Sequence, residues 1–365
     1  MPNYLAMLNA ATPSVVKSLQ GADGNNVTDI IYRKDPLIWH ILSKKTSVGE
    51  GNPNPLSVMK GARYIECPVS FRKAYGGPYG QGVKLNFTSQ DEATSARYTW
   101  SYLTTHATVG IQTLVENEGN EKAYFNIMEN KIRTVMEGMP DVMSTCLHSQ
   151  RSSMLTDTTY GEGIAVTGAT ADKFMYGMGD LFNTTTTTAF GNIQESEISR
   201  WGARATGSAG HAPTNNGTVM GYDLVSDMIN DSRVRDTQDG RANLIVTTYD
   251  LANAYKKAQQ PQVRYGSYKD EKMLEAGFDD HITHDGIPLI GSSFCGSGIV
   301  YALNTRFLDI VTHEKYNFGS AKAIEWREIS TDSPGNLACV CLWVGQFITN
   351  HRLAHVKRTS ITAAS

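Results

Sequence analysis

The chain has 365 residues, of which 40% are hydrophobic and 19% are charged, and its formal net charge is -3. This length exceeds the roughly 250 to 300 residues at which one hydrophobic core stops growing, so we expect two lobes. The balance of charge excludes a protein that grips nucleic acid through a basic surface, because phosphate neutralisation needs clustered Lys and Arg. The charged fraction is also below the roughly 25% of ordinary soluble domains, which indicates a surface that largely faces other protein.

The five cysteines are scattered, odd in number and free of any C-x-x-C pair. This usage is typical of reduced thiols in a cytosolic compartment, and it excludes a zinc ribbon or a disulfide framework. Residues 1–10 lack a basic segment followed by a long apolar core, and no run of the chain approaches 18 apolar residues. We therefore expect neither a secretory signal peptide nor a membrane span.

Residues 1–55 are punctuated by proline and glycine, which predicts an extended arm. Within this arm lies one short apolar cluster, residues 36–42. An exposed apolar cluster needs a partner surface. Two interpretations stay open here: the cluster docks on its own domain, or it packs on a neighbouring subunit.

Alternating apolar residues then predict a long β-hairpin with a glycine-rich tip. Its first strand carries Ile65, Cys67, Val69 and Phe71, its tip spans residues 76–82, and its second strand carries Val83, Leu85 and Phe87. Pro68 marks the first strand as an edge strand, because proline cannot donate to a ladder. A third alternating segment, with Tyr98, Trp100 and Tyr102 on one face and Val109 further on, carries the chain back.

From about residue 120 to residue 150 the apolar period becomes helical. The predicted apolar stripe contains Tyr124, Met128, Val135, Met139, Val142 and Cys146, beside Phe125, Ile132 and Met143. Asn120 is a candidate N-cap, and Glu129 with Arg133 has the i,i+4 spacing of a stabilising pair. Pro140 lies within this helix, where it should kink or break it.

Residues 150–217 are rich in glycine, threonine and serine and predict loops with short elements. The following pattern is α/β. It predicts helices over 218–232 and 250–260, and strands over 243–247, 299–303, 324–329 and 337–348. Asp285-Gly286 lies between the predicted strand segments 282–284 and 287–290, which is a strong signal for a two-residue hairpin. The continuous apolar run 337–348 suits a central strand covered on both faces.

Few residues suggest chemistry. His281-x-x-His284 is the nearest approach to a metal site, but in a strand these positions point to opposite faces. Cys339 and Cys341 sit in an apolar run, which favours buried and inert thiols. The phosphate-binding and nucleophile-elbow motifs are missing from the sequence. We therefore predict no catalytic, cofactor-binding or metal site, and no cofactor.

The order of the predicted elements resembles the HK97-type fold of tailed-phage major capsid proteins. Several local strings are similar to that family: residues 35–45 with their apolar-then-basic pattern, residues 96–100 followed by Ile111 and residues 116–119, residues 277–278, 285–290 and 301–305. The resemblance covers nearly the whole chain, although each string alone is weak.

The resemblance implies an α+β, HK97-like capsid fold with named parts. The implied division is an N-terminal arm over 1–55, an E-loop β-hairpin over 56–105, a P-domain over 106–214 with a spine helix at about 120–150, an α/β A-domain over 215–310, and return strands of the P-domain over 311–365. In such a fold an edge hairpin without local cover is acceptable, because an adjacent subunit completes it. The expected inter-subunit contact residues are Trp39, Leu42, Tyr75, Tyr79, Lys84, Phe87 and Trp100.

The implied function is a non-enzymatic major capsid protein that self-assembles into hexamers and pentamers of an icosahedral shell around packaged viral double-stranded DNA. The expected partners are copies of the chain, a separate scaffolding protein, a portal and decoration proteins, with no sequence-specific DNA binding and no membrane. The expected location is the virion capsid, assembled in the bacterial host cytoplasm. Two alternatives stay open: an encapsulin-type compartment shell, and an α/β enzyme with a mobile hairpin lid.

Overall fold

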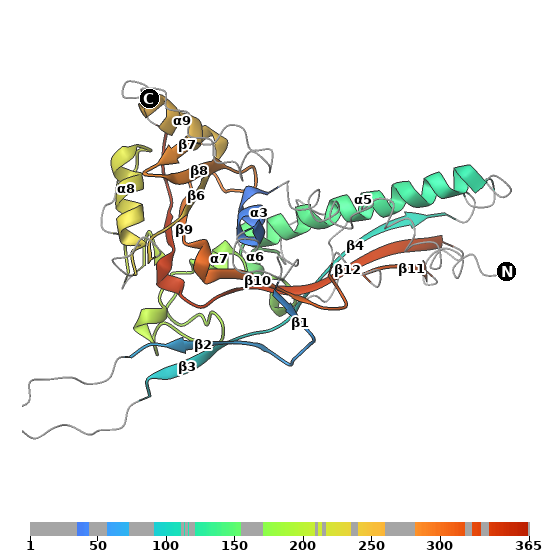
Figure 1. The fold of residues 1–365 in the computed structure, drawn as a ribbon, viewed down its shortest axis with the longest axis horizontal. Helices are drawn as coiled ribbons and strands as arrows, with labels where there is room; N and C mark the ends of the chain where they lie inside the picture. The colour runs from blue at the N-terminus through green and yellow to red at the C-terminus, as the bar shows by residue number, and fades with distance from the viewer. Residues whose placement is uncertain are drawn as a thin grey trace, which may run out of the picture.

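The protein was analysed as a computed structural model of the full chain (Figure 1). The structure describes residues 35–43, 57–72, 91–110, 113, 116, 121–154, 171–208, 211–213, 217–234, 240–259, 282–317, 323–329 and 336–363. Some expectations fall outside these ranges. They concern the glycine-rich tip, Asn120, His281, and the contact residues Tyr75, Tyr79, Lys84 and Phe87.

A long sheet is built around one central strand. Its five strands are β1 (Ser57–Met59), β4 (Ser101–Val109), β10 (Leu308–His313), β11 (Ile324–Ile329) and β12 (Asn336–Thr349). Strand β12 pairs antiparallel with β4, β10 and β11, and β1 pairs parallel with β10. The apolar run 337–348 is therefore the central strand that its sequence predicts, and most of its side chains are buried.

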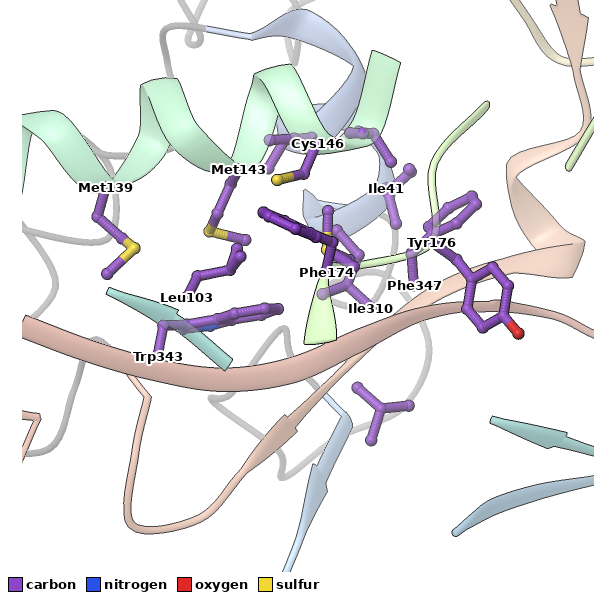
Figure 2. Close-up of a cluster of buried hydrophobic side chains, with 14 of the residues drawn as sticks. Ile41, Leu103, Met139, Met143, Cys146, Phe174, Tyr176, Ile310, Trp343 and Phe347 are labelled. Carbon is purple, nitrogen blue, oxygen red and sulfur yellow. The ribbon is translucent and has the colours of Figure 1, made fainter. Parts of the chain in front are cut away.

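Helix α5 (Glu121–His148) covers this sheet and packs on β4 and β12. The buried residues described for the helix are Met128, Ile132, Val135, Met136, Met139, Pro140, Met143, Ser144, Thr145, Cys146 and Leu147. Figure 2 shows Met139 and Met143 lying over Trp343 of β12 and Leu103 of β4. The helical period of the sequence thus identified both the helix and its buried stripe, and the expected pair of Glu129 and Arg133 forms at 3.2 Å.

Pro140 does not break α5, which continues unbroken through it to His148. The expectation of a break was wrong because the turns on both sides of Pro140 are held by tertiary packing, which overrides local propensity. Met139 and Met143 are buried next to it. From β4, the Thr105 hydroxyl also donates to the Val135 carbonyl oxygen at 3.0 Å, one turn before the proline.

Alanine substitutions at two glycines of this layer should change the free energy of unfolding in opposite directions. In Gly345→Ala the new Cβ would lie 2.7 Å from the Val311 carbonyl oxygen and would meet the Trp343 ring, so we expect the free energy of unfolding to fall by about 1–3 kcal/mol. In Gly138→Ala the new Cβ would meet only Thr105 Cγ2, at 3.8 Å. Because alanine favours a helix more than glycine does, this change should raise the free energy of unfolding by about 0.5–1 kcal/mol. Chemical denaturation of both variants measures the difference. Changes of the same sign in both would contradict the packing described.

The apolar cluster of the arm forms helix α3 (Pro36–Ser43). Leu37, Ile38 and Ile41 are buried within the same core as α5 and β12. Of the two interpretations left open by the sequence, docking on the chain's own domain is therefore correct for these three side chains. The expectation of extended backbone was wrong over this short range, because burying three apolar residues on one face requires a helical turn.

Strands β2 (Ile65–Ser70) and β3 (Ala93–Tyr98) form a separate two-stranded antiparallel ribbon. Its register runs from Ile65 opposite Tyr98 to Ser70 opposite Ala93. Pro68 lies opposite Ser95, in the edge position that its missing N–H requires. In Figure 1 the ribbon projects below and away from the two sheets. Within the described residues β2 and β3 pair only with each other.

The ribbon does not continue smoothly into β4, because the chain leaves the ladder at Thr99 and Trp100. The interruption changes the alternation: Tyr98 is buried, while Tyr102 is 51% exposed. The expectation that Tyr98, Trp100 and Tyr102 share one face was therefore wrong for Tyr102. The buried face of β4 instead begins at Ser101 and Leu103 and ends at Val109.

The second sheet has six strands in the order β5-β13-β9-β6-β8-β7. They are β5 (Arg204–Ala205), β6 (Leu244–Thr247), β7 (Ile282–His284), β8 (Ile287–Gly291), β9 (Val300–Leu303) and β13 (Val356–Arg358). Helices α8 (Tyr222–Asp231) and α9 (Tyr249–Gln259) lie beside it in Figure 1 and share a second hydrophobic core with it. Asp285 and Gly286 have φ values of 50° and 77°, so the predicted hairpin turn is confirmed.

Short elements connect the two sheets, as the glycine and threonine content of residues 150–217 predicts. They are α6 (Arg151–Met154), η2 (Ala171–Lys173), α7 (Met178–Leu181) and η3 (Ser199–Trp201), with η5 (Thr305–Phe307) and η6 (Arg352–Ala354) later in the chain. Sheet membership crosses the implied limits at three strands. Strand β1, within the E-loop limits, pairs with β10 of the long sheet, and β5, within the P-domain limits, pairs with β13 of the second sheet. Strand β13, expected among the return strands of the P-domain, pairs instead with β9 and β5 of the second sheet. The other domain limits stay predictions.

Candidate functional site

One group of side chains in the second sheet has the residue types of a hydrolase site. Ser226 Oγ lies 3.0 Å from Nε2 of His284, and the Tyr255 hydroxyl contacts Nδ1 of the same ring. The Gln259 amide donates to the Tyr255 oxygen, which leaves the hydroxyl hydrogen free to bond Nδ1. The histidine is only 1% exposed, and burial lowers its pKa while Asp285 acts in the opposite direction.

This arrangement indicates structure rather than catalysis, because the ring that would act as the base is inaccessible to a substrate. The group instead fixes α8, α9 and the β7–β8 hairpin to one another. Among the described residues no group of three or more His, Cys, Asp or Glu side chains is placed to hold a metal ion. His284, predicted as half of a weak metal motif, has its ring nitrogens in these hydrogen bonds.

The cysteines of the two cores are buried thiols. Burial raises the pKa of Cys146, Cys295, Cys339 and Cys341 to about 12. A thiol with such a pKa is almost entirely protonated at neutral pH and is a poor nucleophile. The prediction of buried, inert Cys339 and Cys341 is confirmed.

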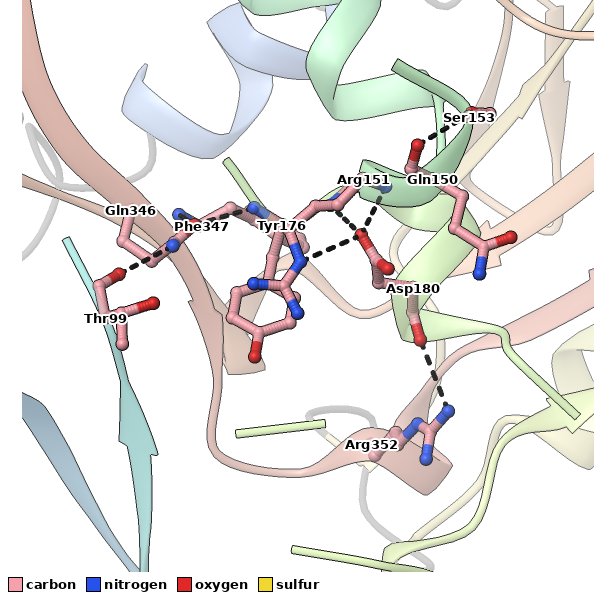
Figure 3. Close-up of polar contacts among 10 residues, drawn as sticks. Thr99, Gln150, Arg151, Ser153, Tyr176, Asp180, Gln346, Phe347 and Arg352 are labelled. Carbon is pink, nitrogen blue, oxygen red and sulfur yellow. Dashed lines mark hydrogen bonds and ion pairs between the residues drawn. The ribbon is translucent and has the colours of Figure 1, made fainter. Parts of the chain in front are cut away.

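The most connected polar cluster lies where the ribbon, the long sheet and the short helices meet (Figure 3). One carboxylate oxygen of Asp180 accepts from the backbone N–H groups of Arg151 and Gly177, at 3.0 and 3.3 Å. The Arg151 guanidinium lies 3.5 Å from the centre of the Tyr176 ring and pairs with the same carboxylate oxygen at 3.7 Å. Burial raises the pKa of Asp180, and Arg151 opposes that shift.

Arg352 occupies the other side of this cluster and is almost wholly buried. Its guanidinium donates to four backbone carbonyl oxygens, those of Asp180, Leu181, Asn183 and Trp201, at 2.7–3.3 Å. Burial lowers its pKa to about 10, and the nearby Glu195 opposes the shift. The side chain therefore stays charged at neutral pH and holds together the loop between α7 and η3.

Gln346 connects the cluster to the point where the ribbon joins the long sheet. Its amide nitrogen donates to the Thr99 carbonyl oxygen at 2.7 Å, and its amide oxygen accepts from the Tyr176 backbone N–H at 2.7 Å. The residue is fully buried on β12. Its side chain thus provides a hydrogen-bond partner for a backbone carbonyl oxygen at the interruption between β3 and β4.

Aromatic packing adds to these hydrogen bonds at the root of the ribbon. Tyr98 makes edge contacts with Tyr176 and Phe190, with ring centres 5.6 and 5.7 Å apart, and its hydroxyl donates to the Thr349 carbonyl oxygen at 2.7 Å. The Arg97 N–H donates to the Gly191 carbonyl oxygen at 2.8 Å. The ribbon is therefore anchored firmly at the end that carries Ile65 and Tyr98.

The opposite end of the described ribbon is more exposed. Ser70 and its partner Ala93 are both exposed there. Nearer the root, Glu66 and Arg97 form a cross-strand ion pair at 2.9 Å, with both side chains about half exposed. Glu66, Pro68 and Ser70 are exposed, while Cys67 and Val69 are half-buried. An anchored root with an exposed outer part is the arrangement of an element that reaches toward another molecule.

Of the expected inter-subunit contact residues, the structure describes the environment of Trp100 alone. Trp100 is 9% exposed, and its ring nitrogen donates to the Ala62 carbonyl oxygen at 2.7 Å. Its ring also makes an edge contact with His313. These contacts lie within the chain, so a contact between Trp100 and a neighbour stays a prediction. Trp39 and Leu42 lie in α3, with side chains outside the described set, and stay predictions as well.

The arm helix is fixed to the end of α5 by a buried polar contact that sequence reasoning missed. Asp35 Oδ2 lies 3.1 Å from His148 Nε2, and Asp35 Oδ1 accepts from the Leu37 N–H at 3.0 Å. Both side chains are nearly inaccessible to solvent. Asp35 just before an apolar run is a recognisable helix-capping signal, but its pairing with a residue so distant in sequence is not.

Among the described residues, no helix has the length and apolar character needed to cross a bilayer.

No family model matches the chain, and no curated protein is similar to it in sequence. Solved structures are similar in fold. The capsid of cyanophage A-1(L) matches with a TM-score of 0.61 at 15% identity, over 91% of this chain and 94% of that one.

Two weaker similarities have the same character. The capsid of a native GTA particle matches with a TM-score of 0.49 at 13% identity, over 84% of this chain and 88% of that one. The SrpI encapsulin of Synechococcus elongatus PCC 7942 matches with a TM-score of 0.44 at 10% identity, over 74% and 78%. Of these three similarities, the one to the cyanophage capsid is strong enough to indicate the fold of this chain. The expected mixed α+β capsid fold is confirmed, because the similarity spans nearly the full length of both chains.

Proposed function

We propose that the chain is the major capsid protein of a tailed phage and that its copies form the hexamers and pentamers of an icosahedral shell around double-stranded DNA. The observation that carries the proposal is the likeness of the whole fold to a phage capsid protein. Fold alone does not determine function, so a second observation matters. The ribbon supplies it, because it is anchored at its root and pairs with no other described strand.

The finer parts of the proposal follow the same fold. Sheet β1-β10-β12-β11 with α5 would form the shell wall as a P-domain with its spine helix. The six-stranded sheet would form the A-domain at capsomer centres, and the ribbon would be the base of an E-loop reaching across a neighbour. Copies of the chain would be the main partners, together with a separate scaffolding protein, a portal and decoration proteins. Assembly would take place in the host cytoplasm.

Two features support a wall that contains DNA without gripping it. The net charge of -3 gives no surplus of cations for phosphate neutralisation. The guanidinium of Arg352 is buried and donates its hydrogen bonds to backbone carbonyl oxygens, so it is not placed to contact DNA. The chain would thus act through protein-protein contacts, in agreement with its low charged fraction.

Gel filtration of the purified chain tests this proposal. We expect capsomers or larger particles that elute far ahead of a 40.0 kDa monomer. Particles recovered from infected cells should contain nuclease-resistant double-stranded DNA. Particles that enclose a protein cargo and no DNA would instead indicate an encapsulin-type compartment. A monomer that turns over a small-molecule substrate would indicate the enzyme alternative.

A further inference from the structure

A cavity of about 530 Å³ lies beside the outer end of the described ribbon, at residues 68–71. Val69 and Phe71 line it from the ribbon side, Arg200 and Arg204 from the segment around η3, and Arg233 from the residues that follow α8. The cavity therefore touches three parts of the molecule that are far apart in sequence. It lies beside the element that the proposed function assigns to contact with a neighbour.

The charges around this cavity have one sign. Among its described lining residues there are four arginines and no aspartate or glutamate. Arg352 is already occupied by its four carbonyl oxygens, but Arg200 and Arg233 are exposed. Within the described part of the chain neither of these two side chains makes an ion pair. Among its described lining residues, the cavity thus carries positive charge without a carboxylate.

Arg204 differs from Arg200 and Arg233, because an acidic residue lies near it. Burial lowers the pKa of Arg204, and Asp231 acts in the opposite direction. Asp231 also pairs with the buried Arg358, at 3.7 Å. Asp231 therefore interacts with two arginines, and Asp227 is a second counter-charge for Arg358. An additional carboxylate entering from outside would find favourable charge on Arg200, Arg204 and Arg233.

The remaining lining is mixed: Ser70, His211, Asn350 and His351 are polar, and the other side chains are apolar. Ile198, Trp201, Phe307 and Leu353 line the cavity together with Val69 and Phe71. The volume is that of a pocket for a small ligand or a few side chains. A DNA duplex presents its phosphates on a convex surface that cannot enter such a space, and a free inorganic anion would leave the apolar lining uncovered. A peptide segment with a carboxylate beside an apolar side chain satisfies both kinds of lining.

We propose that this cavity is the socket for an acidic segment of a second copy of the same chain. This inference rests on the proposed function, which brings many copies together. The chain carries 36 acidic against 33 basic residues, so a second copy can supply a carboxylate. Because the socket and the acidic segment are different surfaces, the contact is head-to-tail, which is the kind that closes rings of subunits. The ribbon and the socket would then engage the same neighbour.

The test is reversal of the two exposed charges in the double variant Arg200→Glu, Arg233→Glu. Its matched control is Arg133→Glu, Lys173→Glu, which changes the net charge equally at two other exposed positions. We expect both variants to keep the melting temperature of the unassembled chain. The socket variant should lose at least tenfold in particle yield, and Arg200→Gln, Arg233→Gln should lie between it and the wild type. The control should assemble normally.

Each other outcome overturns the inference in a recognisable way. Wild-type yield from the socket variant, or an equal loss in the control, would show that the cavity has no specific role while leaving the shell function intact. Normal particles that fail to retain DNA would assign the arginines to nucleic acid. A wild-type chain that never assembles would overturn the proposed function and the socket together.

Discussion

Deleting residues 74–82, the glycine-rich tip expected for the ribbon, should leave a folded chain that no longer assembles. The described contacts that stabilise the ribbon lie at its root, where Tyr98 packs on Tyr176 and Phe190 and bonds to Thr349. The deletion therefore leaves all of these described contacts in place. If the ribbon completes a neighbouring subunit, its loss removes an interface from every copy, so the effect on particle yield should be large.

Melting temperature and particle yield are measured together in this experiment. We expect a melting temperature within about 2 °C of the wild type, consistent with the small effect of surface changes, and a loss of most particles. A deletion of the same length over residues 157–165, in the glycine- and threonine-rich loop region, is the control. Undiminished particle yield from the 74–82 deletion would remove the ribbon from the interface.

Replacing Arg352 with methionine should cause the largest loss of stability of any single substitution considered. The carbonyl oxygens of Leu181, Asn183 and Trp201 would lose the donor described for them, while that of Asp180 keeps the Asn183 N–H at 3.3 Å. Each buried acceptor left without a donor costs about 1–3 kcal/mol. Since the loop can relax partly toward water, we expect a total loss of about 3–5 kcal/mol in the free energy of unfolding. The loop between α7 and η3 should become accessible to proteases.

Arg327→Met is the matched control for this substitution. Arg327 lies on β11 with its side chain 65% exposed, and it pairs only with the exposed Glu325 among the described residues. Its replacement should change the free energy of unfolding by less than about 1 kcal/mol. Chemical denaturation of both variants gives the comparison. A loss below 1 kcal/mol for Arg352→Met would mean that its carbonyl contacts contribute little.

The periodicity of apolar residues in the sequence predicted the elements in which buried side chains recur at a regular spacing. The helical stripe from Met128 to Cys146 and the apolar run of β12 are examples, because each buries one continuous surface. The Asp285-Gly286 turn was predictable for a different reason. It needs two residues that tolerate positive φ, and only a few residue types do so.

The failures have a common physical origin in contacts between distant residues. Whether α5 continues through Pro140 is decided by packing on β4 and β12, which the local sequence does not contain. The outward face of Tyr102 follows from an interruption held by Gln346, whose amide reaches Thr99 across the fold. In each case a tertiary contact overrode a correct local tendency.

The candidate site shows the same limit more strongly. Arg352 was not identified because its partners are backbone carbonyl oxygens, which any sequence can supply. The socket joins Val69, Arg200 and Arg233 from three segments, and none of them forms a motif alone.

The central claim is that this chain builds a shell, and electron cryomicroscopy of the purified, assembled protein tests it most directly. The account predicts closed icosahedral particles whose hexamers and pentamers are each made of this chain. In such a map α5 should lie in the shell wall, and the ribbon should contact an adjacent subunit next to Arg200 and Arg233. Dispersed 40.0 kDa monomers under every assembly condition, with no capsomers, would contradict it.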